Sequence, residues 1–310
     1  MQILNTLAPP AGPARQALAG GTAVALGFFD GVHTGHQAVI RAAVQHAAAH
    51  GLAPAVFTFG LPPASGLKGG RLLSDAEKHR RIGALGVEWY FAPAFEEFRG
   101  LSPAQFVREV LVGLYHAKAV FCGGNFTFGK DRAGNAAVLR QLCGAAGVEV
   151  CTLPMAMHEG APVSSTRIRT ALEGGDLPGA NAMLGGCYRI DFPVRHGHGL
   201  GRTLGFPTIN QVYPAGFLMP RYGIYITRVR IEGAWYAGAT GLGTRPTVNT
   251  GNEGPTCETF IQDFCGNAYG EDPVLEFHRY LCPSRRFDTL DELRGCIRDA
   301  AEKARRYFAG

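Results

Sequence analysis

The sequence has 310 residues, of which 46% are hydrophobic and 18% are charged. This composition excludes an intrinsically disordered chain, and the length allows one large domain or two of ordinary size. The formal net charge of +5 is too small and too scattered to indicate a nucleic-acid or membrane partner, although it is compatible with anionic small molecules. No apolar run approaches the roughly 20 residues of a membrane span, and the N-terminus lacks the pattern of a signal peptide. We therefore expect a cytoplasmic protein whose eight cysteines are reduced and mostly buried.

The first half of the chain alternates short β-branched or aromatic runs with helical patterns. We expect strands at residues 22–28, 55–59, 87–91, 118–122 and 148–153, and helices at 37–50, 75–85, 103–114, 136–146 and 166–173. The helix at 37–50 has an apolar stripe at Val39, Ile40, Ala43, Val44 and Ala47. Five strands separated by helices predict a doubly wound, Rossmann-like parallel sheet. Such sheets bind ligands at the carboxyl ends of their strands.

The second half changes to alternating strands with Gly, Pro and Asn turns. We expect strands at residues 188–194, 223–231, 234–238, 256–263 and 273–280, with no helix between them, and an amphipathic helix at 290–308. Such a run of strands predicts an antiparallel barrel or sandwich. We place the boundary near residues 180–187, which divides the chain into domains at 1–183 and 184–310.

The segment Gly27–Gln37, GFFDGVHTGHQ, joins the first expected strand to the first long helix. Its glycines let the backbone approach a ligand, and His33 and His36 lie at a helix start whose N–H groups favour an anion. Two imidazoles there can donate hydrogen bonds to the charge that develops on a nucleotide phosphate. Surface histidines in a turn, or two zinc ligands, are the alternatives. The candidate nucleotide-binding residues of this segment are Gly27, Phe28, Asp30, Gly31, His33 and His36.

A second anion site is indicated by VSSTRIR, where hydroxyl groups precede a short helix that begins with arginine. Its candidate phosphate ligands are Ser164, Ser165, Thr166 and Arg167. A serine that only caps the helix is the alternative, but three hydroxyls with Arg167 and Arg169 exceed what a cap needs.

The stretch Gly124–Asp131, GNFTFGKD, begins like a phosphate-binding P-loop but ends in Asp where Ser or Thr should bind magnesium. We therefore reject a P-loop. The two Phe and Asn125 suit a wall for an aromatic ligand, and ordinary loop packing is an equal alternative.

The segment HGHGLGRTLGFPTIN, at residues 196–210, combines glycines with oxygen-bearing side chains. Gly199, Gly201 and Arg202 are candidates for nucleotide binding, because glycines leave backbone N–H groups exposed to a ligand. Thr208 and Asn210 supply two oxygens on one face of an extended segment, which Mg²⁺ prefers; a plain glycine-rich turn is the alternative. Glu258, in TCETFIQDF, is a candidate base or ion ligand, and an exposed strand Glu is equally consistent with the pattern.

Six segments, in this order and spacing, closely resemble the bacterial bifunctional riboflavin kinase/FMN adenylyltransferase family, also called FAD synthetase: GFFDGVHTGHQ, VSSTRIR, GRTLGFPTIN, GLGTRPT, CETFIQDF and YG. The resemblance covers nearly the whole chain, from about Thr22 to Phe308. One difference is TFGLPP, at residues 58–63, where the family usually has TFDPHP.

The resemblance implies an α/β nucleotidyltransferase domain that transfers AMP from ATP to FMN, followed by an antiparallel β-barrel riboflavin kinase domain with a C-terminal helix. It implies that His33, His36 and residues 164–167 bind ATP phosphates, and that Asn125 contacts the flavin. It also implies that Thr208 and Asn210 bind Mg²⁺ and nucleotide and that Glu258 is the general base of the kinase. The substrates would be riboflavin, FMN and ATP, and both halves would need Mg²⁺.

Two other functions remain as alternatives. A cytidylyltransferase or pantetheine-phosphate adenylyltransferase with an accessory barrel would account for HxGH and SSTRIR but not for LGFPTIN or Glu258. An RNA-binding barrel would need exposed aromatics interleaved with basic residues, which the sequence does not clearly supply.

Overall fold

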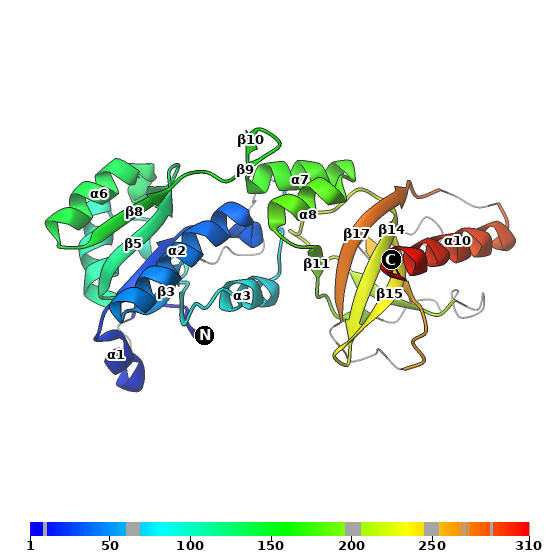
Figure 1. Ribbon diagram of the computed structural model, residues 1–310, viewed down its shortest axis with the longest axis horizontal. Helices are drawn as coiled ribbons and strands as arrows, with labels where there is room; N and C mark the ends of the chain where they lie inside the picture. The colour runs from blue at the N-terminus through cyan, green and yellow to red at the C-terminus, as the bar shows by residue number, and fades with distance from the viewer. Residues whose placement is uncertain are drawn as a thin grey trace. The chain divides into compact units, whose positions relative to one another are not determined.

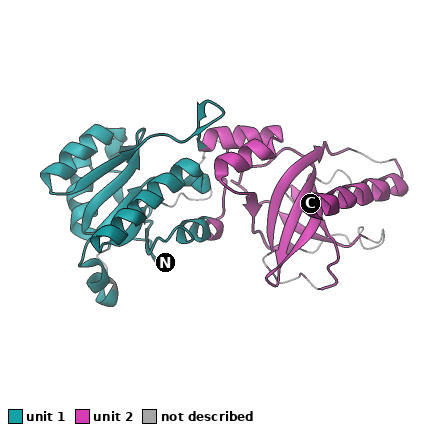
Figure 2. Ribbon diagram, in the orientation of Figure 1, with its two compact units in different colours: residues 1–65, 78–164 teal, residues 66–77, 165–310 magenta. Residues whose placement is uncertain are grey.

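The computed structural model describes residues 1–8, 11–59, 69–195, 206–244, 254–266, 268, 271, 273–285 and 288–309. The chain forms two compact units, shown in Figure 2: unit 1 comprises Met1–Ser65 and Lys78–Ser164, and unit 2 comprises Gly66–Glu77 and Ser165–Gly310. Unit 2 therefore includes a short stretch from the first half of the chain. The division into separately foldable domains at 1–183 and 184–310 stays a prediction.

Unit 1 contains a parallel sheet of six strands in the order β1-β4-β3-β2-β5-β8. Figure 1 labels β3, β5 and β8 of this sheet. Its strands are β1 (Gln2–Leu4), β2 (Thr22–Leu26), β3 (Ala53–Phe57), β4 (Trp89–Phe91), β5 (Ala117–Gly123) and β8 (Glu149–Leu153). The doubly wound parallel sheet is thus confirmed. Sequence analysis missed β1, because three mostly exposed residues carry no strand pattern.

The helices predicted for unit 1 are found near their predicted positions. They are α1 (Gly12–Leu18), α2 (Thr34–His50), α3 (Asp75–Gly83), which continues from unit 2 into unit 1, α4 (Phe95–Phe98), α5 (Pro103–Gln105), a π-helix (Phe106–Leu114) and α6 (Ala136–Ala145). The helix expected at 103–114 is therefore confirmed in position, and its residues Phe106–Leu114 form a π-helix. Apolar periodicity does not distinguish an α-helix from a π-helix over so few residues.

The core of unit 1 lies between this sheet and its helices. Strand β2, TAVAL, is buried at every position, as expected for the centre of a parallel sheet. Helix α2 buries Val39, Ile40, Ala43 and Ala47 along one face, which matches the predicted apolar stripe. The helix ends at Gly51, whose φ of 65° is the left-handed conformation typical of a residue after a helix.

The shorter elements of unit 1 lie in its loops. They are η1 (Asp30–Val32), β6 (Thr127–Phe128), η3 (Lys130–Arg132), β7 (Gly134–Asn135), β9 (Met157–His158) and β10 (Ala161–Pro162). The first of these follows the carboxyl end of β2, and the next three follow that of β5.

Unit 2 contains an antiparallel sheet in the order β11-β17-β14-β15-β16-β13-β12. Its elements are α7 (Ser165–Gly174), α8 (Leu177–Leu184), β11 (Tyr188–Ile190), β12 (Val194–Arg195), β13 (Thr208–Val212), β14 (Gly223–Ile231), β15 (Ala234–Gly243), β16 (Thr256–Ile261), β17 (Val274–Cys282) and α10 (Leu290–Ala309). The antiparallel β class and the terminal helix are confirmed. Helix α8 was missed, although Asp176 caps it by accepting from Gly179 N at 3.0 Å.

One face of the antiparallel sheet is filled by large aromatic side chains and three hydroxyls. Tyr188, Tyr225 and Phe277 are fully buried there. The hydroxyl of Thr240 lies 2.8 Å from the hydroxyls of both Thr227 and Thr259, so these buried polar groups satisfy one another across three strands. On the other face, Ala300 and Ala301 of α10 pack against Ala239.

The stretch from the first half of the chain is held to unit 2 by backbone hydrogen bonds. Arg71 N donates to Gly216 O at 2.8 Å, and Leu218 N donates to Arg71 O at 2.9 Å. Ser74 Oγ donates to Asp191 Oδ2 at 2.6 Å. Residues 69–77 therefore pack as part of unit 2 although they are far from it in sequence.

None of the eight cysteines forms a disulfide bond in the structure. That they are reduced stays a prediction. The expectation that most are buried is wrong. Cys122, Cys143 and Cys257 are buried, Cys265 and Cys282 are exposed, and the other three are half-buried.

Candidate active sites

The first candidate site lies at the carboxyl edge of the parallel sheet. From β2 the chain continues to β3 and β4 on one side of β2, and from β4 it returns to β5 on the other side of β2. The topological switch point therefore lies between β2 and β5. Ligands of doubly wound sheets bind at this point. The segment after β2 carries His33 and His36, and the loop after β5 carries Asn125. The topology therefore brings these sequence-predicted residues to one edge.

The backbone that leads from β2 into α2 is strained. Phe29 has a φ of 52°, Gly31 of 83° and Val32 of 45°. Positive φ is rare for an aromatic residue and a genuine outlier for a β-branched one, and it costs about 1–3 kcal/mol per residue. Asp30, Gly31 and Val32 are buried, whereas Gly27 and Phe28 are half-buried. Such strain clusters at binding sites, which supports a ligand-binding role for this loop.

His33 and His36 form a stacked pair at the start of α2. Their ring centroids lie 3.6 Å apart with an interplanar angle of 17°. His33 caps the helix, because its Nδ1 accepts from His36 N at 3.3 Å. This contact assigns the proton of neutral His33 to Nε2. His36 Nδ1 is shielded from solvent and has no hydrogen-bond partner among the described residues.

Both imidazoles are neutral near pH 7. Burial lowers the pKa of His33 to about 4. The pKa of His36 lies well below 6.5 because of burial, with further lowering by His33 and by the charge of Lys78. The pair therefore offers neutral N–H donors beside the first turn of a helix, which is an arrangement suited to an anionic ligand.

Lys78 is a component of this site that sequence analysis did not single out. Its side chain is 8% exposed. Its Nζ donates to Phe28 O at 2.7 Å and to Thr58 Oγ1 at 3.1 Å, and Thr58 Oγ1 donates to Phe28 O at 2.9 Å. A lysine in the charged helix pattern DAEKHRR is typical of a solvated face, so the sequence carries no signal for this role.

The predicted phosphate-binding residues of VSSTRIR are divided between the two units. Ser164 is the last residue of unit 1, and α7 of unit 2 begins at Ser165. Thr166 is exposed and Arg167 is half-buried. Arg169 is buried, and its Nε donates to Gly70 O at 2.8 Å, so this arginine holds the backbone of unit 2.

The loop after β5 contributes an exposed Asn125. Phe126 and Phe128 stack with centroids 5.8 Å apart, and Phe128 is buried in the core of unit 1. For Phe128 the structure thus favours ordinary packing over a wall for an aromatic ligand. Residues 60–63, in the TFGLPP segment, lie outside the described residues.

The second candidate site is formed by the strand register of unit 2. Strands β13 and β16 are antiparallel neighbours, and Asn210 is the partner of Glu258. Thr208 lies two residues before Asn210, so it shares the same face of β13. The structure thus brings together the two predicted metal ligands and the predicted base, although β13 and β16 are far apart in sequence. Gly199, Gly201 and Arg202 lie outside the described residues.

Glu258 is exposed, and its neighbour on the other side is Gly241 of β15. Among the described residues, a Cβ atom at Gly241 would contact only Ile224 Cδ1 at 3.7 Å and Glu258 O at 4.0 Å, so within this part of the chain the glycine leaves space beside the carboxylate. Asn210 is buried and Thr208 is half-buried. The site therefore places oxygen donors and an accessible carboxylate on one side of the sheet.

Comparison with known proteins identifies both halves. The FAD synthetase family model matches residues 15–167, and the riboflavin kinase family model matches residues 184–308. The chain belongs to the bifunctional riboflavin kinase/FMN adenylyltransferase family. The match to both models disfavours a nucleotidyltransferase of another type with an accessory barrel, because that alternative leaves residues 184–308 unexplained.

Relatives in this family match along most of their length. A bifunctional riboflavin kinase/FMN adenylyltransferase of Bacillus subtilis is 36% identical over 295 residues, which cover 92% of each chain. That of Haemophilus influenzae is 33% identical over 294 residues, which cover 93% of this chain and 94% of its own.

A solved structure has the same fold. It is that of a protein named macrolide-efflux protein, from Streptococcus pneumoniae, which is 28% identical and has a TM-score of 0.84 over 98% of both chains. The name describes that protein and says nothing about the activity of this chain. Among the described residues of this chain, no helix is both long and apolar enough to cross a membrane.

Proposed function

We propose that the chain phosphorylates riboflavin to FMN in unit 2 and transfers AMP from ATP to FMN at the His33–His36 site, releasing pyrophosphate. The observation that carries the kinase assignment is the register of β13 and β16, which pairs Asn210 with Glu258. Membership of the bifunctional family supports both activities.

In the kinase, Glu258 is the general base. The 5′-hydroxyl of riboflavin must lose a proton as its oxygen attacks the γ-phosphorus of ATP, and a positioned carboxylate contributes about 10² to 10⁴ fold. Glu258 is exposed and is bordered by Gly241, so a substrate hydroxyl has space to reach it.

Thr208 and Asn210 are the proposed Mg²⁺ ligands. A hydroxyl and an amide oxygen on one face of a strand are hard oxygen donors, which fit Mg²⁺ when water and phosphate oxygens complete the coordination. When bound, the ion would neutralise charge on the ATP phosphates. Gly199, Gly201 and Arg202 are proposed to contact the nucleotide on the basis of sequence alone.

In the adenylyltransferase, the phosphate oxygen of FMN attacks the α-phosphorus of ATP while the bond to pyrophosphate breaks. His33 Nε2–H and the first N–H groups of α2 are donors for the charge that develops on the phosphate oxygens. His36 holds a shielded Nδ1 that a ligand donor can satisfy. Gly27, Phe28, Asp30 and Gly31 shape this loop, and Ser164–Arg167 and Asn125 are proposed contacts to ATP and flavin.

The substrates proposed are therefore riboflavin, FMN and ATP, with Mg²⁺, and neither activity requires nucleic acid or a membrane. We propose that the protein acts in the cytoplasm. The small net charge of +5 supports the absence of a nucleic-acid or membrane partner.

The test is to incubate the purified full chain with riboflavin, ATP and Mg²⁺ and to separate FMN from FAD by chromatography. We expect both products. Glu258→Gln should lower FMN formation by about 10² to 10⁴ fold and leave conversion of supplied FMN to FAD unchanged. His36→Ala should lower FAD formation at least about a hundredfold and leave FMN formation unchanged. Equal loss of both activities in either variant would indicate a folding defect. Unchanged kinase activity in Glu258→Gln would refute the assignment of Glu258 as the general base.

A further inference from the structure

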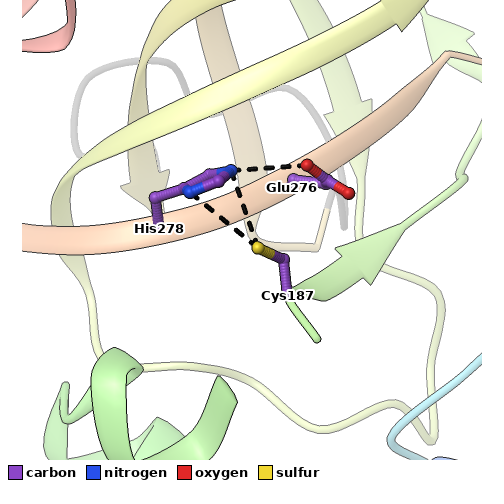
Figure 3. Close-up of side chains that lie close together, drawn as sticks. All are labelled: Cys187, Glu276 and His278. Carbon is purple, nitrogen blue, oxygen red and sulfur yellow. Dashed lines mark hydrogen bonds and ion pairs between the residues drawn. The ribbon is translucent and has the colours of Figure 1, made fainter. Parts of the chain in front are cut away.

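Cys187, Glu276 and His278 form a cluster of reactive side chains in unit 2 that the proposed activities do not use (Figure 3). Cys187 directly precedes β11, and Glu276 and His278 lie two residues apart on the neighbouring strand β17. The register between β14 and β17 shifts next to His278, which has no partner residue on β14. Such a bulge redirects a side chain, and here it accompanies an imidazole placed beside the thiol.

Glu276 is fixed by cations on both neighbouring strands. Its carboxylate is 1% exposed; Oε1 pairs with Arg189 of β11, and Oε2 pairs with Arg228 of β14 at 2.8 Å. Glu77 of α3 lies 3.9 Å from Arg189. Burial would raise the pKa of Glu276, but the hydrogen bond from His278 and the two guanidiniums lower it to about 2. This carboxylate is therefore ionised across the physiological range.

The ionised Glu276 favours a protonated His278. His278 Nε2 donates to Glu276 Oε2 at 3.3 Å. Burial would lower the pKa of His278, but its contacts with Cys187 and Glu276 raise it to about 9. The aromatic rings of Tyr307 and Phe308, from α10, pack edge-on to the imidazole with centroids 5.7 and 4.8 Å away. These two rings help to hold the imidazolium in place.

The thiol of Cys187 faces this cation. Its Sγ lies 3.8 Å from His278 Nδ1 and 3.7 Å from Nε2. A thiolate is stabilised by nearby positive charge, and the thiolate is the nucleophilic form of cysteine. Cys187 is half-buried, so small reagents can reach it. We propose that Cys187 is a nucleophilic thiol, activated by His278 and Glu276, at which low-molecular-weight disulfides form a reversible mixed disulfide.

The proposed step is a thiol–disulfide exchange. The Cys187 thiolate attacks one sulfur of the small disulfide, the disulfide bond breaks as the new Sγ–S bond forms, and the other half leaves as a thiolate. The imidazolium of His278 can give its proton to that leaving thiolate. The disulfide is the oxidant, and a free small thiol reverses the reaction.

The other cysteines provide a contrast. Burial raises the pKa of the Cys143 thiol to about 11 and raises that of Cys257 further, so both are inert thiols. Cys265 and Cys282 are exposed, but neither has a histidine contact among the described residues. Exposure alone would therefore predict that Cys265 and Cys282 react faster than Cys187, whereas activation by His278 predicts that Cys187 reacts fastest.

A divalent metal ion is the competing occupant of this cluster. The near-equal distances from Sγ to the two ring nitrogens show that sulfur faces the ring as a whole, not the lone-pair direction of one nitrogen. Both oxygens of Glu276 already pair with guanidinium groups, and a cation there would lie close to two positive charges. The geometry therefore favours the ion pair over metal coordination.

The test is to treat the full chain with oxidised glutathione at pH 6.5 and to follow each cysteine by peptide mass spectrometry. A thiol with an ordinary pKa near 8.5 is about 1% thiolate at this pH, so we expect Cys187 to react at least about tenfold faster than Cys265 or Cys282. The advantage should shrink by pH 9. His278→Phe should slow Cys187 to the rate of the exposed cysteines.

Two controls separate the outcomes. Cys187→Ser should remove the fast-reacting site and leave the rates of Cys265 and Cys282 unchanged. If His278→Phe fails to fold, the pH dependence of wild-type Cys187 relative to Cys265 decides the question. A Cys187 rate equal to or below that of Cys265 at pH 6.5 overturns the proposal. Stoichiometric zinc in the purified protein, with labelling of Cys187 only after chelation, would also overturn it and assign a metal site.

Discussion

Lys78 provides a stringent test of the adenylyltransferase site, because its buried ammonium group fixes the backbone at Phe28. We expect Lys78→Met, which keeps the length and removes the charge, to lower kcat/KM for FMN adenylylation by about 10 to 100 fold. The reason is positional: small displacements of a catalytic group cost on this scale. Riboflavin phosphorylation should not change, since its residues lie in unit 2.

The effect on stability should be much smaller than the hydrogen bonds suggest. Two bonds from a charged donor are worth about 3–6 kcal/mol together. Burying an ammonium group costs several kcal/mol, which the substitution recovers. Phe28 O also keeps its bond from Thr58. Since these two effects oppose one another, we expect the free energy of unfolding, measured in urea titrations, to fall by less than the two hydrogen bonds alone are worth.

The pH profile distinguishes positioning from a general structural defect. The charge of Lys78 helps to hold the pKa of His36 low, after the larger effect of burial. Without that charge the pKa of His36 rises, so His36 becomes protonated at a higher pH. The acidic limb of FMN adenylylation in Lys78→Met should move to higher pH, whereas Lys118→Met, at an exposed position, should match wild type. Unchanged adenylylation and an unchanged profile in Lys78→Met would refute this role.

Three further predictions concern unit 2. Gly241→Leu fills the space beside Glu258 and should abolish detectable FMN formation while far-UV circular dichroism and FAD formation from FMN persist. A fragment of residues 165–310 should phosphorylate riboflavin, and its free energy of unfolding should exceed that of a fragment of residues 184–310 by at least about 2 kcal/mol. The reason is that Asn181 of α8 donates to Phe277 O and accepts from Tyr188 N. Equal unfolding midpoints in urea would contradict this. Glu276→Gln should be less stable than wild type near neutral pH, and the gap should narrow as pH falls from 4.5 toward about 2, where wild-type Glu276 also loses its charge.

The sequence was sufficient where local pattern determines structure. The stripe from Val39 to Ala47 predicted which face of α2 is buried, and the alternation of strands and helices predicted the parallel sheet. Features that depend on distant contacts were not predictable in the same way. The pairing of Asn210 with Glu258 is a property of strand register, and the burial of Lys78 depends on a carbonyl fifty positions away. Neither relation leaves a periodic signal in its own segment.

The discontinuous composition of unit 2 has a consequence for biosynthesis. Residues 69–77 leave the ribosome early. Arg71 forms a strand-like bridge with Phe217, which is synthesised about 150 positions later. At ordinary elongation rates the interval between the two residues is roughly 7–30 s. During that interval Leu72 and Leu73, which are buried in the folded chain, lack every contact that the second half supplies. Residues 69–77 can therefore take their place in unit 2 only after the second half of the chain has been made.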